Sequence, residues 1–127
     1  MSPEDAIASL NRQLSQHGED IILTRVVGTS NQAKSSAKVR AFVRGYAPHE
    51  LVGGIIQGDS HVTISPTDLA RTQWPGGTVS NQSDLSDHQV PLKNDRCVVA
   101  GRTRTVQAAQ PFYLSGVLVR IEMQVRG

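Results

Sequence analysis

Residues 117–126 read VLVRIEMQVR, the longest alternation of apolar and polar side chains in the protein. A period of two is the pattern of a β-strand with one buried face. The expected core-facing side chains are those of Val119, Ile121, Met123 and Val125, and the expected outward-facing ones are those of Arg120, Glu122 and Gln124. Because this is the strongest strand pattern in the chain, the fold is expected to be a β-sheet that includes it. An exposed edge of this strand would also be available for pairing with a neighbour.

The preceding sequence predicts five more strands, at 20–27, 38–46, 61–65, 96–100 and 103–108. Pro111 is expected to interrupt the chain after the last of these. Short turns or single helical turns are expected at 48–54 and 66–68. No helical pattern separates the later strands, and parallel strands need long crossover connections, so the sheet should be mostly antiparallel.

One helix is expected at the N-terminus, over about residues 3–16. Ser2 is a good N-cap residue, and the apolar Leu10 and Leu14 recur with helical spacing. Gly18 is expected to end the helix in the left-handed conformation that glycine readily adopts.

Together these elements predict a mainly β fold: a small antiparallel β-barrel or sandwich of about six strands with a short N-terminal helix and long loops. The 127 residues suit a single domain spanning 1–127. We expect residues 1–18 to form the helical segment and 19–127 the barrel, with a long loop at about 71–90.

Two polar segments interrupt the strand pattern. Residues 28–37 (GTSNQAKSSA) are expected to form a long hairpin loop or to be locally mobile, and residues 71–89 show no sustained period. A loop as long as the second is uncommon in a compact domain and often has a function. Its most conspicuous residue is Trp74, the only tryptophan. Trp74 either anchors an interface with a neighbouring subunit or fills the core of its own subunit.

The composition excludes several classes of protein. Hydrophobic residues make up 38% of the chain and the net charge is only +2, too weak to indicate nucleic-acid binding from charge alone. No apolar run reaches the length of a membrane span, and the acidic N-terminus does not resemble a signal peptide. The single cysteine, Cys97, excludes an intramolecular disulfide and is expected to be a packed, unreactive thiol. A soluble intracellular protein is expected.

No sequence motif predicts catalysis or a cofactor. None of the four histidines has the spacing of a metal site on a helix. The chain lacks the Gly-x-Ser-x-Gly sequence of a hydrolase nucleophile, and its glycines at 53–58 do not form a phosphate-binding loop. We therefore expect a protein that is not an enzyme, with no metal and no cofactor.

The strand at 38–46 has an unusual second face. Val39, Ala41 and Val43 form its apolar face, whereas the opposite face is basic and aromatic. The residues of that opposite face are Lys38, Arg40, Phe42, Arg44 and Tyr46. It is either an ordinary solvated face, a subunit interface or a surface facing DNA. Arg120 and Arg126 of the last strand are further candidates for an interface or a channel lining.

The order and spacing of these segments resemble a known family. The segments are VRAFVRGYAPHELVGGIIQGD at 39–59, a V-x-I-S strand, PLKNDRCVVAGRTRTV at 91–106 and the closing G-x-L-V-R-I-x-x-Q-V-R-G at 116–127. Over residues 20–127 the chain resembles the small head-closure proteins of tailed bacteriophages, also called head–tail connectors or stoppers. The family usually has Gly-Asp before the fifth strand, where this chain has Asn94-Asp95. Asparagine also tolerates a positive φ, so the turn can be kept.

The resemblance implies a structural protein of the virion neck, assembled in the host cytoplasm. Such a subunit would form a homo-oligomeric ring, hexameric or dodecameric, around packaged double-stranded DNA. Its partners would be a portal or adaptor protein on one side and a tail terminator or tail tube protein on the other, with no membrane. Some members of the family block the channel with a long loop, which here would be the segment at about 71–90.

Two other functions remain open from the sequence. One is a tail-completion or terminator protein, which would also form a β-rich ring. The other is a small barrel that binds single-stranded nucleic acid, with Phe42, Tyr46 and the arginines supplying stacking and backbone contacts.

Overall fold

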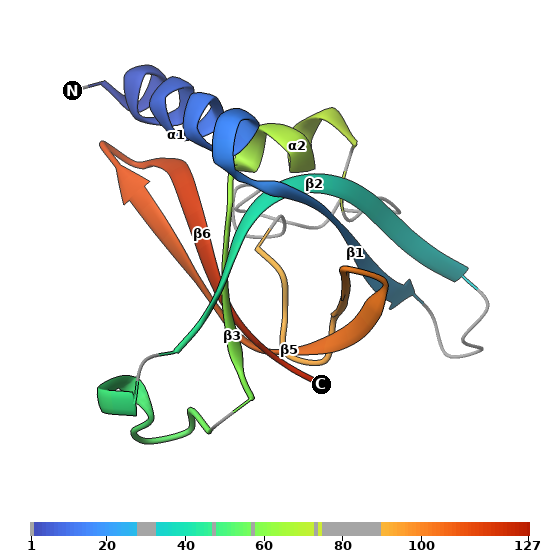
Figure 1. The fold of residues 1–127 in the computed structure, drawn as a ribbon. Coiled ribbons are helices and arrows are strands. Elements are labelled where there is room, and N and C mark those ends of the chain that lie inside the picture. The colour runs from blue at the N-terminus through green and yellow to red at the C-terminus, as the bar shows by residue number, and fades with distance from the viewer. Residues whose placement is uncertain (1, 28–32, 47, 57, 73, 75–89) are drawn as a thin grey trace.

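The protein is a closed, six-stranded antiparallel barrel with two helices at one end (Figure 1). The computed structural model describes residues 2–27, 33–46, 48–56, 58–72, 74 and 90–127. The strands are β1 (Glu19–Val27), β2 (Ala33–Gly45), β3 (Ser60–Ile64), β4 (Arg96–Val99), β5 (Arg102–Leu114) and β6 (Val117–Arg126). The helices are α1 (Pro3–His17), α2 (Pro66–Arg71) and the short 3₁₀ turn η1 (Pro48–Glu50). The predicted fold class is confirmed, and of its two forms the barrel is correct.

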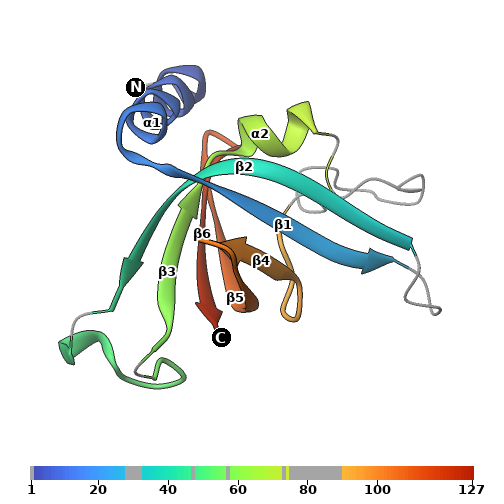
Figure 2. The ribbon, with the colours of Figure 1, turned by 45° about the vertical axis from the view of Figure 1, so that its right-hand side comes forward.

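The strands close in the order β1-β2-β3-β6-β5-β4, and every pairing is antiparallel. Two long hairpins, β1–β2 and β5–β6, form most of the wall. β3 joins them on one side by pairing with β2 and β6, and β4 joins them on the other by pairing with β1 and β5. In Figure 2, β1 and β2 cross above the other strands as one twisted ribbon.

Helix α1 begins and ends at residues that the sequence marks. The Ser2 side chain accepts a hydrogen bond from the Asp5 backbone N–H at 3.1 Å, as an N-cap does. Gly18 ends the helix, but its φ is −87°, so the predicted left-handed conformation is wrong. Glycine is needed for space instead: a Cβ would lie 2.6 Å from the Leu14 carbonyl oxygen and 2.8 Å from that of Ala41.

The core fills the barrel with aliphatic side chains from every strand. Its members include Leu23, Val39, Val62, Ile64, Leu69, Trp74, Cys97, Val106, Ile121, Met123 and Val125. Short β-branched and aliphatic side chains alternate inward along the strands because successive residues point to opposite faces. Val90 also joins the core, so the end of the predicted 71–90 loop contributes to packing. Residues 73 and 75–89 of that loop lie outside the described residues.

Two predicted boundaries are wrong by several residues, each because strand pairing extends an element. β2 begins at Ala33, inside the segment predicted to be a loop, because it pairs with β1 as far as Val27. β5 runs from Arg102 to Leu114 without stopping at Pro111. Beyond Val106, β5 pairs with β6 on one side, and no other strand of the described residues pairs with it on the other side. Such an edge accommodates a residue without an N–H.

The third correction concerns β6. The core-facing side chains of Ile121, Met123 and Val125 are confirmed, but Leu118 is buried in place of Val119. Phe112 pairs with Arg120 and the next residue of β5 pairs with Leu118, so Val119 is an extra residue in β6. This bulge reverses the alternation at the start of the strand.

Candidate interface surfaces

The outward face of β2 is the first candidate surface, and the predicted alternation of this strand is confirmed. Val39 and Ala41 are buried, whereas Lys38 and Arg44 are exposed and Phe42 is half-buried. The structure therefore brings Lys38, Arg40, Phe42, Arg44 and Tyr46 onto one side of the strand. Their charges, however, are largely used within the subunit.

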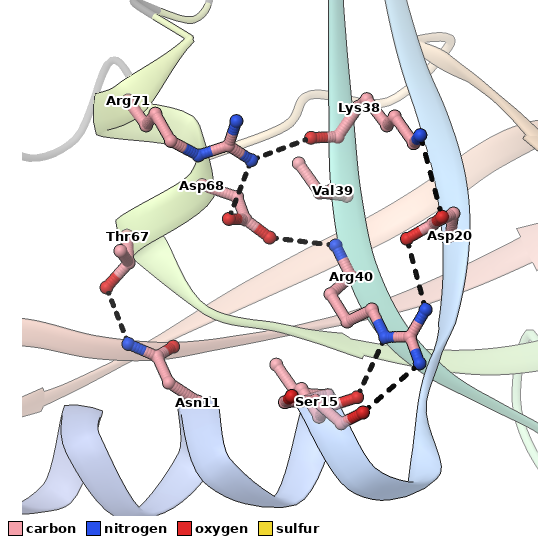
Figure 3. Close-up of a pocket in the computed structure, with 10 residues that line it drawn as sticks. Asn11, Ser15, Asp20, Lys38, Val39, Arg40, Thr67, Asp68 and Arg71 are labelled. Atoms are coloured by element: carbon pink, nitrogen blue, oxygen red, sulfur yellow. Dashed lines mark hydrogen bonds and ion pairs between the residues drawn. The ribbon is translucent and has the colours of Figure 1, made fainter.

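Arg40 connects β2 to the end of α1 (Figure 3). Its Nε donates to the Leu14 carbonyl oxygen at 3.0 Å, and a terminal nitrogen donates to that of Ser15 at 3.3 Å. The Leu14 carbonyl oxygen also accepts a hydrogen bond from the Gly18 N–H at 2.8 Å, so Arg40 adds a second donor to it. A cation at the C-terminal end of a helix also complements the helix dipole. The other terminal nitrogen donates to Asp20 at 3.2 Å. Arg40 is therefore a structural link between helix and barrel.

A hollow of about 710 Å³ lies around this link, between α1, α2 and β2 (Figure 3). Its positive side chains face carboxylates: Lys38 lies 3.6 Å from Asp20, and Arg71 lies 2.9 Å from Asp68. The hydrogen bond from Arg40 lowers the pKa of Asp20 below its ordinary value. Because these charges are already paired, the hollow offers little free positive charge to an anion.

Arg44 and Tyr46 are also engaged, at the far end of β2. Arg44 binds Glu50 of η1 through both terminal nitrogens, at 3.1 and 3.2 Å, and lies over the Tyr46 ring with its central carbon 5.6 Å from the ring centroid. The Tyr46 ring meets His61 of β3 edge-on, with centroids 5.8 Å apart. Burial raises the pKa of Tyr46. This end of the face is a packed cluster that fixes η1 against the barrel.

The two candidates on β6 have different surroundings. Arg120 forms an exposed pair with Glu122 at 3.0 Å, and Glu122 also bonds His61 at 2.8 Å. Arg126 instead binds a buried carboxylate, Asp59, with Nε at 2.8 Å and a terminal nitrogen at 3.0 Å. The same terminal nitrogen donates to the Gly54 carbonyl oxygen at 2.9 Å. Arg126 thus holds the loop before β3 against β6, which is a structural role.

Trp74 lies in the core of its own subunit, the second of the two alternatives left open by the sequence. Its side chain is 2% exposed, and the guanidinium carbon of Arg25 lies 5.1 Å from its ring centroid. Arg25 is held there by Asp95, with a shortest N···O distance of 2.6 Å. A side chain buried in this way has no surface to offer a neighbouring subunit.

The β5–β6 hairpin presents a surface that the sequence analysis missed. Phe112, Tyr113 and Val117 are 37%, 43% and 44% exposed near its tip. Phe112 and Val119 also line a groove of about 360 Å³ against α1, with Ala6 on the opposite side. The sequence does contain a signal for this surface. Phe112 and Tyr113 directly follow Pro111, and aromatic residues are scarce: the chain has only two phenylalanines and two tyrosines.

No set of three or more His, Cys, Asp or Glu side chains in the described ranges is arranged to hold a metal ion. Among the same residues, no helix has the length and apolar character needed to cross a membrane. No protein-family model matches the chain, and no curated protein sequence matches it significantly.

Proposed function

We propose that the protein is a structural subunit of a ring in the neck of a tailed bacteriophage, between the portal or adaptor and the tail. The observation that carries this proposal is the β5–β6 hairpin, which exposes Phe112, Tyr113 and Val117 on a small barrel with few aromatic residues. Exposed apolar side chains gathered on one face often mark protein–protein contacts. Phe112 and Val117 are on the outward face of the hairpin, whereas Tyr113 pairs with the buried Leu118 on the other face. An assembly subunit needs such surfaces more than it needs a pocket with converging polar groups.

The resemblance to head-closure proteins supports the same role. The segments that carry it include β4 and β6 and parts of β2, β3 and β5. Asn94, which stands where the family usually has glycine, has a φ of 79° in the turn before β4, a left-handed conformation that glycine adopts readily. The Asp95 side chain accepts a hydrogen bond from the Leu92 N–H at 2.8 Å and completes the turn.

The nucleic-acid-binding alternative receives less support. It needs free arginines and accessible aromatic rings on β2. Arg40 and Arg44 are bound to carbonyl groups and carboxylates, and Tyr46 packs on His61. The charge left for a phosphate backbone is therefore small.

The proposed function is tested by reconstituting the neck. Purified protein is mixed with portal–adaptor assemblies from the same phage and, separately, with tail tubes, and bound complexes are separated by sedimentation and imaged. We expect a weakly associating monomer in isolation that forms a closed ring on the portal–adaptor assembly. A ring formed only on tail tubes would instead identify a tail terminator. A monomer that joins neither would overturn the proposal.

A matched pair of variants makes the test specific to the hairpin. Phe112→Ser combined with Tyr113→Ser removes the exposed aromatic rings and should reduce ring formation while leaving the fold intact. Val52→Ser changes a 67% exposed apolar residue in the loop before β3 and should assemble as the unsubstituted protein does. Equal assembly by all three proteins would show that the hairpin is not an assembly surface.

A further inference from the structure

Helix α1 is attached to the barrel differently from α2. Within α1, which the structure describes completely, only Leu10 and Leu14 are buried. Neither belongs to the cluster of buried side chains that fills the barrel, whereas Leu69 of α2 does. Helix α2 is therefore part of the barrel core, and α1 lies outside it.

Hollows in the molecular surface follow α1 along its length. On the side of α2 and β2, Asn11 and Leu14 line the hollow of about 710 Å³. On the side of the β5–β6 hairpin, Ala6 and Leu10 line the groove of about 360 Å³. At the end of the helix, His17 lines a third hollow, of about 430 Å³, over β2, β3 and β6. A helix bordered by open space makes fewer van der Waals contacts than one enclosed by its neighbours, so it is held less tightly.

Polar contacts hold the second half of α1 to the rest of the subunit. Arg40 of β2 donates to the carbonyl oxygens of Leu14 and Ser15, at 3.0 and 3.3 Å. Asn11 donates to the Thr67 hydroxyl oxygen, in the first turn of α2, at 3.0 Å. The contacts to Ser15 and Thr67 are exposed, where water competes for the same groups, whereas the contact to Leu14 is partly buried. Because it is also charge-assisted, the bond from Arg40 to Leu14 is the strongest of these three attachments.

The junction between α1 and the barrel is a single residue, Gly18. The next residue, Glu19, already pairs with Ala41 of β2, and β1 is soon paired on its other side with β4. The helix can therefore turn relative to the barrel only by a change in the backbone angles near Gly18. Glycine has the widest range of such angles, and hinges are short segments of this kind.

We propose that α1 is a lid, which opens as a unit about Gly18 while the six strands and α2 stay folded, and that Arg40 is its latch. Figures 1 and 2 show α1 lying across one end of the barrel, outside the ring of strands. Opening separates Leu10 and Leu14 from the barrel and breaks the bonds from Arg40. The core cluster remains intact, because α1 contributes no side chain to it.

The open and closed states differ in the apolar surface that they present. In the closed state Leu10 lines one groove with Phe112 and Val119. Opening uncovers the apolar side of the helix and the part of β6 beneath it, so the lid controls how much apolar surface this end of the molecule exposes. Elements that move in this way are those with few buried apolar contacts. The lid is a property of the single subunit and does not depend on the neck role.

Native-state hydrogen exchange on the unsubstituted protein tests the lid. The backbone amides of residues 7–17 are compared with those of β3 and β6 in the same molecule. We expect the α1 amides to be protected at least about a hundredfold less than the most protected amides of β6, because they exchange by a local opening. Their protection should also change little in dilute urea, since a local opening exposes little surface. One common protection for α1 and β6 would mean that α1 opens only when the barrel unfolds, and would overturn the proposal.

A matched pair of arginine variants tests the latch. Arg40→Ala removes the bonds to Leu14 and Ser15 and should speed exchange in α1 about tenfold, the effect of losing one charge-assisted hydrogen bond, while β6 changes much less. Arg44→Ala, on the same face of β2, releases Glu50 of η1 and should leave exchange in α1 unchanged. Equal acceleration of α1 and β6 by Arg40→Ala would refute the latch, as would equal acceleration of α1 by the two variants.

A second measurement compares two thiols in one chain. Cys97 is fully buried in the barrel core, so its reaction reports opening of the barrel. Leu10→Cys places a second thiol between α1 and the barrel. Short pulses of a thiol reagent should label position 10 at least about tenfold faster than Cys97, and adding Arg40→Ala should increase that ratio. Labelling of the two thiols at one common rate would overturn the proposal.

The lid and the proposed function can fail separately. Equal protection of α1 and β6 would overturn the lid and leave the neck role untouched. A protein whose α1 opens alone but which joins neither portal–adaptor assemblies nor tail tubes would support the lid and refute the neck role.

Discussion

Replacing Asp59 by Asn should destabilise the fold through one buried charge. The Asp59 side chain is fully buried and accepts hydrogen bonds from the Ile56 backbone N–H at 3.1 Å, from Gln124 at 2.6 Å and from Arg126 at 2.8 and 3.0 Å. These donors, Arg126 first, lower its pKa from 3.8 to about 2. In Asp59→Asn the shape is nearly kept, but the negative charge between them is lost.

The magnitude follows from the pKa. At about 1.4 kcal/mol per pKa unit, the fall from 3.8 to about 2 corresponds to at most about 2.5 kcal/mol of stability. The Arg126 side chain is 37% exposed, so solvent screens part of this interaction and water can solvate the arginine in the variant. We expect Asp59→Asn to lower the free energy of unfolding at neutral pH by about 1–2 kcal/mol.

The sign of the pH dependence is also fixed. The pKa of Asp59 is lower in the folded state, so its contribution is fully present above the unfolded-state value near 3.8 and is lost as the pH falls through about 2. Urea unfolding of the two proteins at a series of pH values should show a gap that is constant from neutral pH to about 5 and narrows below 4.

Asp20→Asn is the matched control. Asp20 also faces an arginine and also has a lowered pKa, but its side chain is 51% exposed. Exposed ion pairs contribute little to stability, so this variant should unfold close to the unsubstituted protein. Equal destabilisation by the two variants, or a gap for Asp59→Asn that does not narrow in acid, would refute the reasoning from the buried charge.

Four further outcomes are expected. Trp74 should already emit at short wavelength in the free subunit and shift to the red only on unfolding; red emission from the folded monomer would contradict its burial. Ile121→Ala should cost about 2–5 kcal/mol in urea unfolding, and Val119→Ala clearly less, because only Ile121 is fully buried. Gly18→Ala should lower the melting temperature because its Cβ would clash with carbonyl oxygens of α1 and β2, and an unchanged melting temperature would refute that close packing. Cys97 should react with a thiol reagent at the rate of unfolding; fast reaction in the native protein would show that the thiol is accessible.

How far the candidate site was predictable depends on the distance between partners in the sequence. The alternation at 38–46 placed Lys38, Arg40 and Arg44 on one outward face, and this is confirmed. It could not show that Arg40 reaches the Leu14 carbonyl or that Arg126 reaches Asp59, because these partners are 26 and 67 residues apart. Their roles as structural links emerge only when α1 and the loop before β3 are folded against the barrel.

The sequence by itself determined what is local. The capping residue before α1, the period-two strands and the positive φ of Asn94 each depend on a few neighbouring residues, so composition and spacing predict them. The tertiary structure decided everything that depends on pairing. The partner strand β5 moved Leu118 into the core in place of Val119. The burial of Trp74 and the exposure of Phe112 were likewise decided by the closed barrel, because its interior has a fixed volume and only the complete set of strands determines which large side chains it encloses.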